Sequence, residues 1–297
     1  MSNTTADLHR KIDGAGDLQS VVRTMKAVAA SSIGQYEKSV SALGDYYHTV
    51  ELGLGACIRE SAQERLIAQP NDPAAARAIG AVVFGSDQGL VGQFNDVVAD
   101  FAVQSLRPLH AKTAVWAVGE RVHEALAGAG VPLVGVFEVP SSVNGITALV
   151  GQILIETEPH QQHEEAAELH LFYNHPVPGG DYAPADQRLL PLDETWRSKL
   201  IQLPWPTRSL PQVLGSSIRA LRALIREYLF VSLFRACAES LASENASRLA
   251  AMQRADKNID DLLETLNADF HRLRQSGIDE ELFDVVSGFE ALSQKQG

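Results

Sequence analysis

Apolar residues recur every three or four positions over a long stretch at the start of the chain. They are Leu8, Ile12, Ala15, Val22, Met25, Ala29, Ile33, Tyr36, Val40, Leu43, Tyr47, Val50, Leu54 and Ile58, with Gln19 as one polar interruption. This spacing places the apolar side chains on one narrow face of an α-helix, as coiled-coil packing requires. Residues 1–60 are therefore predicted to form a long helix.

The C-terminal stretch has the same period. No glycine or proline occurs in the 60 residues from Ser216 to Gln275, and one helix over them would extend roughly 90 Å. Its apolar positions are Leu214, Ile218, Leu221, Ile225, Tyr228, Val231, Phe234, Ala238, Leu241, Leu249, Met252, Ile259, Leu263, Leu266, Phe270 and Leu273. Asn245 and Asp256 interrupt this stripe, where they either fix the register of a coiled coil or are tolerated at its surface.

The two long segments are expected to pack on each other, since neither can bury its apolar stripe alone. Small Ala and Ser residues at 27–32 and 236–243 would permit a close approach of the two helices. A coiled coil built from both ends of one chain is the resulting prediction.

The middle of the chain has a different pattern, because all 13 prolines lie between Pro70 and Pro211. Short, mostly apolar runs at 78–87, 113–118, 131–139 and 167–174 read as buried strands, separated by helix-compatible stretches near 91–106, 119–129 and 143–157. That alternation predicts a small, Rossmann-like, parallel-sheet α/β domain over 61–206, inserted between helices at 1–60 and 207–297. Residues 61–78 look like its entry linker, and 174–188 look like a long loop before a final short strand.

Composition narrows the function. The formal net charge is −12, and residues 61–206 carry 17 acidic against 8 basic groups, so this region should repel nucleic acid. Only two cysteines occur, Cys57 and Cys237, without metal-ligand spacing, and no cofactor site is expected. No stretch has the features of a signal peptide or a membrane span.

Three stretches resemble the gamma subunits of the rotary, F-type ATP synthases. The residues from Leu233 to Leu292 look like the family's terminal helix almost position for position. The run from Leu8 to Ile33 is similar to its opening helix, including the Met-x-x-Val-Ala-Ala-Ser core that begins at Met25. In the middle, GSDQGLVGQFN resembles a family motif through Ser86, Asp87, Gly89, Leu90 and Gly92.

The resemblance implies a central rotor shaft, non-catalytic itself, that transmits torque during ATP synthesis or hydrolysis. It implies an antiparallel coiled coil whose upper part lies inside a ring of alpha and beta subunits, while the α/β foot contacts the epsilon subunit and the membrane c-ring. The expected location is the cytoplasmic side of a bacterial inner membrane, as a peripheral protein. A shaft of this kind would act mechanically, because its different faces would stabilise different ring conformations.

The resemblance also implies contacts with the alpha/beta ring at Met25, Lys26, Arg248, Arg274 and Gln275. Met25 could equally be a core methionine of the coil, and the two arginines could be solvated helix charges. Positions that depart from the usual family pattern are Gln88, Val91, Gln93, Phe94 and Asp279. These departures fit a divergent branch of the family, the sodium-linked type included.

Three other functions fit parts of the sequence. Gly85, Gly89 and Gly92 follow a strand as in a phosphate-binding turn, but neither GxGxxG nor GxxxxGK[ST] is satisfied, which disfavours a nucleotide-binding enzyme. A static coiled-coil scaffold satisfies the periodicity equally well, and only its partners would distinguish it from a rotor.

A metal site is the third alternative. The histidines and glutamates near residues 160–175 are His160, His163, Glu164, Glu165, Glu168, His170 and His175. They lack the HExxH order that brings two ligands and a base together, and a solvated acidic connection is the favoured interpretation.

Overall fold

The computed structural model describes residues 4–60, 78–109, 111–162, 168–179, 181–209 and 211–293. The chain forms two compact units, one of Met1–Val28 with Leu249–Gly297 and one of Ala29–Arg248. Helix α1 (Thr5–Glu60) and helix α6 (Ser217–Ser293) each contribute to both units. The two long terminal helices predicted from the apolar period are thus confirmed, and α6 continues through Gly277.

The predicted stripe of α1 is the face that the helix buries. Its buried members are Leu8, Ala15, Val22, Ala29, Tyr36, Val50, Leu54 and Ile58, and the polar Gln19 is buried among them. On α6 the buried members are Leu221, Tyr228, Val231, Phe234, Ala238, Leu241 and Met252. Leu214 is an exception, because it precedes the helix and is 90% exposed.

Within each unit the two helices run antiparallel. In the first unit His9 lies beside Phe270, with ring centroids 5.8 Å apart, while Lys26 pairs with Asp256. In the second unit the Tyr46 hydroxyl donates to Glu227 over 2.7 Å, and Val213 N, just before α6, donates to Glu60 at 3.3 Å. The residue numbers of one helix rise as those of the other fall, which defines the antiparallel arrangement.

Both polar interruptions of the α6 stripe have a structural explanation. The Asp256 carboxylate accepts hydrogen bonds from Lys26 Nζ at 2.6 Å and from Arg23 Nε at 3.3 Å, both on α1. Asn245 instead turns back on its own helix, where Nδ2 donates to the Leu241 carbonyl at 2.8 Å. Asp256 therefore links the two helices, whereas the side chain of Asn245 makes its hydrogen bond within α6.

A five-stranded sheet lies between the two helices in the sequence, with strand order β3-β2-β1-β4-β5. Its strands are β1 (Ala78–Phe84), β2 (Lys112–Val118), β3 (Leu133–Phe137), β4 (Glu168–Val177) and β5 (Asp181–Leu190). The first four pair in parallel, and β5 pairs antiparallel to β4. Three helices follow the first three strands: α2 (Phe94–Leu106), which ends in the short 3₁₀ helix η2 (Arg107–Leu109), then α3 (Glu120–Gly128) and α4 (Val143–Gln162).

The expectation of a long loop over 174–188 is wrong. Strand β4 continues to Val177, and β5 returns from Asp181, so most of this stretch forms a hairpin. Pro184 made the segment look like a loop, because proline cannot donate a hydrogen bond to a ladder. It is tolerated here because β5 is an edge strand of the described sheet. The expected entry linker falls almost wholly on residues 61–77, which lie outside the described residues.

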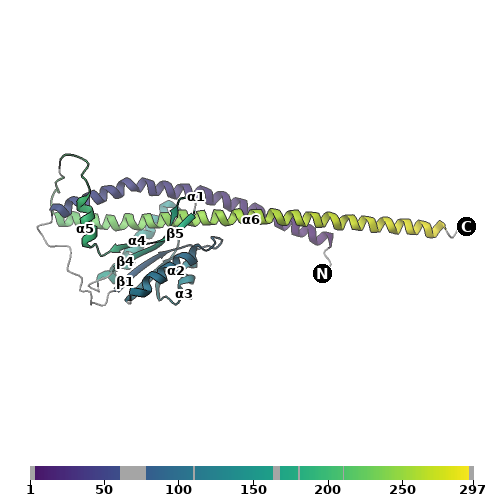
Figure 1. Ribbon diagram of the computed structural model, residues 1–297, viewed down its shortest axis with the longest axis horizontal. Coiled ribbons are helices and arrows are strands. Elements are labelled where there is room, and N and C mark those ends of the chain that lie inside the picture. The colour runs from purple at the N-terminus through teal and green to yellow at the C-terminus, as the bar shows by residue number, and fades with distance from the viewer. Residues whose placement is uncertain are drawn as a thin grey trace. The chain divides into compact units, whose positions relative to one another are not determined.

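Helices cover both faces of the sheet (Figure 1), and each face has its own apolar core. On one face α2 and α3 pack against β1, β2 and β4 through residues such as Val98, Val122 and Phe172. On the other face α4 packs together with α1 and α6, through Ile153, Tyr36 and Leu233. The long helices are thus part of the sheet domain's core, which fixes the domain to them in this unit.

A third apolar cluster encloses the C-terminal end of α1 and the N-terminal end of α6. It includes Leu54, Leu221 and Tyr228, covered by Leu200 of α5 (Glu194–Gln202). Helix α5 was not foreseen from the sequence. The Asp193 side chain caps it by accepting a hydrogen bond from Trp196 N at 2.9 Å, a local signal of helix initiation.

Candidate functional site

The loop after β1 carries the motif residues Ser86, Asp87, Gly89, Leu90 and Gly92. Ser86 is fully buried, and it exchanges hydrogen bonds with Asn95 at the start of α2. Ser86 N donates to Asn95 Oδ1 and Asn95 Nδ2 donates to Ser86 Oγ, both at 2.9 Å, while Ser86 Oγ donates to the Gln88 carbonyl. The serine is therefore a structural residue of the loop, held by an asparagine that the sequence analysis did not single out.

Asp87 joins three segments at the carboxyl edge of the sheet. One carboxylate oxygen accepts a hydrogen bond from Glu120 N at 3.0 Å, and the other accepts from Val139 N at 2.9 Å. Glu120 is the first residue of α3, so the carboxylate accepts a hydrogen bond from a backbone N–H at the N-terminus of that helix, where a negative charge is favoured. Asp87 therefore joins the glycine-containing loop to the start of α3 and to the segment after β3, which is a structural role.

Two glycines outside or at the edge of the motif allow this close packing. Gly85 has no room for a side chain, because an added Cβ would lie 2.3 Å from Val122 Cβ. Gly119 has φ of 111°, and its Cβ would lie 2.7 Å from the Ser86 carbonyl carbon. The loop after β1 and the start of α3 can approach each other only with glycine at both positions.

Replacing Gly119 with alanine is expected to destabilise the protein by roughly 2–4 kcal/mol, from backbone strain and the contact with Ser86. Gly128 supplies the control, since it lies on α3 with nothing within 4 Å of its added Cβ. There, alanine should be neutral or stabilise by up to about 1 kcal/mol. Urea unfolding of both variants gives the comparison, and equal effects would contradict the packing argument.

The tip of the motif loop is strained and exposed. Leu90 has φ of 63°, unusual for a residue with a side chain, and its side chain is 62% exposed. The next residue, Val91, is 2% exposed. An exposed leucine held in the left-handed region is a feature of a contact surface more than of a core.

The loop contacts α6 near the end of the second unit. Ser247 Oγ donates to the Val91 carbonyl at 2.5 Å. One turn earlier, Glu244 accepts from Arg248 Nη2 at 2.6 Å, with side-chain exposures of 6% and 14% for the acid and the arginine. Burial raises the pKa of the Glu244 carboxyl, Arg248 opposes this, and Asp87 adds to the rise.

Arg248 therefore lies in a shielded ion pair beside the motif loop. Its Nε finds no hydrogen-bond partner among the described residues. The family resemblance implied that Arg248 contacts the ring. The ion pair with Glu244 gives Arg248 a role inside this protein as well. Glu244 and Ser247, which complete this junction, had no signal in the sequence.

Removing Arg248 should leave Glu244 buried without its partner. Arg248→Ala is expected to cost about 3 kcal/mol at neutral pH. The double variant Arg248→Met with Glu244→Gln should recover most of that loss, because no uncompensated charge remains buried. Denaturant unfolding measures both, and an unchanged stability in the single variant would leave Arg248 as a contact residue alone.

Met25 and Lys26 lie in the other unit, on α1. Met25 is partly exposed and Lys26 is bound to Asp256 of α6. Leu18, Val21 and Val28 are each more than half exposed, and with Met25 they follow a 3/4 spacing along one outer face of α1. Met25 thus borders an apolar stripe that the coiled coil leaves uncovered.

Arg274 and Gln275 are exposed on α6, in the same unit as Met25. From His271 to Ser287 every residue of α6 is exposed. The large apolar residues among them are Leu273, Ile278, Leu282, Phe283, Val285 and Val286, and Phe283 is 77% exposed. This apolar end of α6 has no covering partner within the described residues of its unit.

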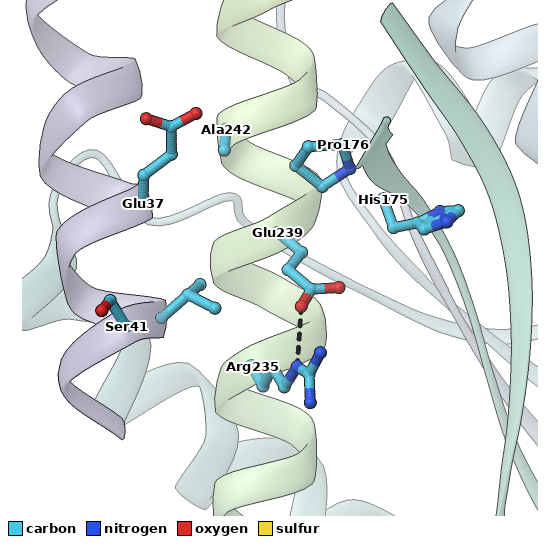
Figure 2. Close-up of a pocket in the computed structure, with 8 residues that line it drawn as sticks. Glu37, Ser41, His175, Pro176, Arg235, Glu239 and Ala242 are labelled. Carbon is cyan, nitrogen blue, oxygen red and sulfur yellow. Dashed lines mark hydrogen bonds and ion pairs between the residues drawn. The ribbon is translucent and has the colours of Figure 1, made fainter. Parts of the chain in front are cut away.

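A pocket of about 370 Å³ lies between α1, α6 and the end of β4, and Figure 2 shows the residues that line it. Two of its charged residues pair with each other, since Arg235 Nε donates to Glu239 Oε1 at 2.7 Å. His175 Nδ1 lies 3.1 Å from the Ala183 carbonyl on β5. Burial and Glu239 raise the pKa of nearby Tyr173 to about 12. The polar contacts around the pocket therefore join residues of this protein to one another, as is expected where helices pack on a sheet.

Two of the histidines considered as metal ligands, His170 and His175, lie on β4. His170 on β4 lies between Asp186 Oδ1, 2.8 Å from Nδ1, and Glu168 Oε2, 3.2 Å from Nε2. His163, Glu164 and Glu165 lie outside the described residues. In the described part of the chain no group of three His, Cys, Asp or Glu side chains could hold a metal ion.

His170 should make stability depend on pH. Burial lowers its pKa, but the hydrogen bonds and charges of Asp186 and Glu168 outweigh burial, so the pKa is raised. A raised folded-state pKa contributes stability that is complete below about pH 6.5 and is lost as pH rises through the folded value. Thermal unfolding of His170→Gln should show a smaller fall between about pH 6 and pH 9 than the parent, with His123→Gln as control.

Comparisons with known proteins identify the family to which this chain belongs. A family model described as ATP synthase matches residues 4–292. The ATP synthase gamma chain of Syntrophus aciditrophicus is 27% identical over 300 residues, covering 97% of this chain and 98% of the relative. That of Sulfurihydrogenibium sp. is 26% identical, covering 96% and 97%.

Solved structures give the same fold. A chain of the Euglena gracilis mitochondrial ATP synthase, in a structure of its OSCP, F1 and c-ring, aligns with a TM-score of 0.65 at 16% identity, covering 99% of this chain and 96% of that one. A chain from the central stalk and c-ring of the Tetrahymena thermophila enzyme aligns with a TM-score of 0.58 at 22% identity, covering 79% and 99%. This chain therefore shares its fold, two long terminal helices and a five-stranded sheet domain between them in the sequence, with these two ATP synthase chains.

The chain belongs to the ATP synthase family, as a gamma-type member. The family resemblance drawn from its terminal helices and its central motif is confirmed. None of the helices in the described ranges is long and apolar enough to cross a membrane.

Proposed function

We propose that this chain is the central rotor shaft of an F-type ATP synthase, which transmits torque between a membrane c-ring and a catalytic ring of alpha and beta subunits. In this role it is non-catalytic, and it lies peripherally on the cytoplasmic side of a bacterial inner membrane. Residues 1–60 and 207–297 form the shaft, and residues 61–206 form the foot, which also binds an epsilon subunit.

The observation that carries this proposal is the apolar end of α6. Residues 271–287 are exposed throughout, and they include six large apolar side chains. Such a surface on a helix without a covering partner among the described residues of its own unit is typical of a protein-binding site. A closed ring of subunits around the helix would cover all of its sides, whereas a groove on a single partner would cover only one side.

The outer stripe of α1 supports the same role. Leu18, Val21 and Val28 are exposed, and Met25 lies between them in the helical repeat. Met25, Lys26, Arg274 and Gln275 belong to one unit with the apolar end of α6, so we propose that all four contact the ring. Arg248 is proposed to contribute through the junction with the motif loop as well as by contact.

The test is to purify a tagged form of the chain from its native membranes, identify the bound proteins and assay ATP hydrolysis. Recovery of three alpha and three beta subunits with one copy of this chain would support the rotor. Recovery of a dimer of this chain without ATPase activity would identify a static scaffold instead.

A further inference from the structure

A groove of about 570 Å³ runs between α4 and the first part of α6, inside the second unit. Its apolar walls come from Leu154 and Ile155 on α4 and from Ile225 and Leu229 on α6. Ile155 is 70% exposed. Gly151 lies in the same groove, and a Cβ added there would meet no atom within 4 Å. The groove is therefore open and apolar.

Three arginines follow one face of α6 along this groove. Arg219, Arg222 and Arg226 are spaced by three and four residues and all are exposed, and the last two line the groove directly. Within the described part of the chain none of them forms an ion pair, whereas Arg197 and Arg235 do. No carboxylate of a described residue lines the groove. A run of unpaired guanidinium groups is unexpected in a chain of net charge −12.

We propose that this groove binds an acidic amphipathic helix of another protein subunit. Apolar residues of that helix would enter between Ile155 and Ile225, and its carboxylates would pair with Arg222 and Arg226. The guanidinium fork matches a carboxylate with two parallel hydrogen bonds. A helix laid in a groove with anchors at a 3/4 spacing is a recurring mode of recognition.

The dimensions fit a short helical segment. Residues 219–226 span roughly 10 Å along α6, or about two helical turns, so two or three carboxylates of a parallel helix could meet the arginines. An anionic membrane surface is a poorer occupant, because it would meet the acidic residues around the groove as well as the arginines. A single helix would meet mainly the groove, whose described lining holds no carboxylate. In its choice of partner, a further subunit of the rotor complex, the proposal rests on the function proposed above.

The test places the photo-crosslinking residue benzoyl-phenylalanine at position 155 in the full-length chain, in the complex purified from its membranes. The control carries it at Glu124, an exposed position on α3, on the opposite face of the sheet. Illumination should join position 155 to an acidic amphipathic peptide of another subunit, and position 124 should not join to that peptide. A link to lipid, to this chain or a second copy, or no link at all, would overturn the proposal.

Charge reversal tests the arginines separately. Arg222→Glu with Arg226→Glu should lower the yield of the crosslink at least about tenfold, since two carboxylate pairs become repulsive. Arg107→Glu with Arg121→Glu makes the same change in net charge at exposed positions beside α2 and on α3, and should leave the yield unchanged. Equal yields in the two double variants would contradict carboxylate recognition.

Recovery of the alpha and beta subunits is scored in the same samples. A complete ring without the crosslink would overturn the groove and leave the rotor standing. The crosslink without a ring would overturn the rotor assignment and leave the groove standing as a docking site.

Discussion

Replacing Ala238 with proline is expected to cost roughly 4–6 kcal/mol of stability. About 3 kcal/mol comes from the missing N–H and the clash of the ring with the preceding turn of α6. The rest comes from overpacking, because Ala238 is fully buried in the core that α6 shares with the sheet domain. A loss of this size approaches the whole stability of many domains.

Ala238→Gly is the matched control, because glycine keeps the N–H and adds no volume. It should cost only about 1 kcal/mol. Urea unfolding followed by circular dichroism at helical wavelengths would compare the two variants. If both lose the same stability, the continuity of α6 at this point does not support the sheet domain, and α6 is not an essential part of its core.

The coiled coil could be predicted because its signal is repeated many times. Ala15, Val22, Ala29 and Tyr36 lie seven residues apart, and all four are buried. Because each of these apolar residues indicates the same buried face, a single polar residue such as Gln19 does not hide the helical period. The alternating strands and helices of the foot were predicted for the same reason, since buried parallel strands are continuous apolar runs.

The hairpin of β4 and β5 could not be predicted in this way. Strand β5 has the sequence DYAPADQRLL and lies half exposed at the edge of the sheet. Its polar residues and Pro184 are acceptable only because this strand lies at an edge. That condition is set by the order of strands, which local sequence does not encode.

The contacts of the motif loop were also beyond sequence reasoning. Asp87 bonds to backbone groups at Glu120 and Val139, which are 33 and 52 residues away in the chain. The glycines of the loop resemble a phosphate-binding turn only in part, and their spacing disfavoured that function. The critical close approach occurs at Gly119, in another segment. For Arg248 the family resemblance indicated a contact surface, but only the structure shows the shielded Glu244 beside it.

Truncating the chain after Leu266 is expected to abolish most coupling between ATP hydrolysis and ion pumping, while the foot still binds the membrane rotor. The deletion removes the apolar end of α6, proposed above as the ring contact. It also removes Phe270, which lies beside His9 of α1. ATP-driven ion uptake should fall at least about tenfold in inverted membrane vesicles, measured with hydrolysis in the same samples, because several buried apolar contacts are lost together.

Point substitutions separate the ring contact from the loss of helix. Replacing Ile278, Leu282, Phe283 and Val286 with serine keeps the length of α6 and removes four exposed apolar side chains. Burying each such side chain against a partner is worth about 1.5–3 kcal/mol, so their combined loss should reproduce most of the truncation. Serine at Glu280, Glu281 and Asp284 is the control, since these exposed charged residues lie on the same turns. Pumping that survives the apolar substitutions but fails in the control would show that charged residues make the contact. The exposed apolar surface would then no longer be a reason to place this end of α6 inside a ring.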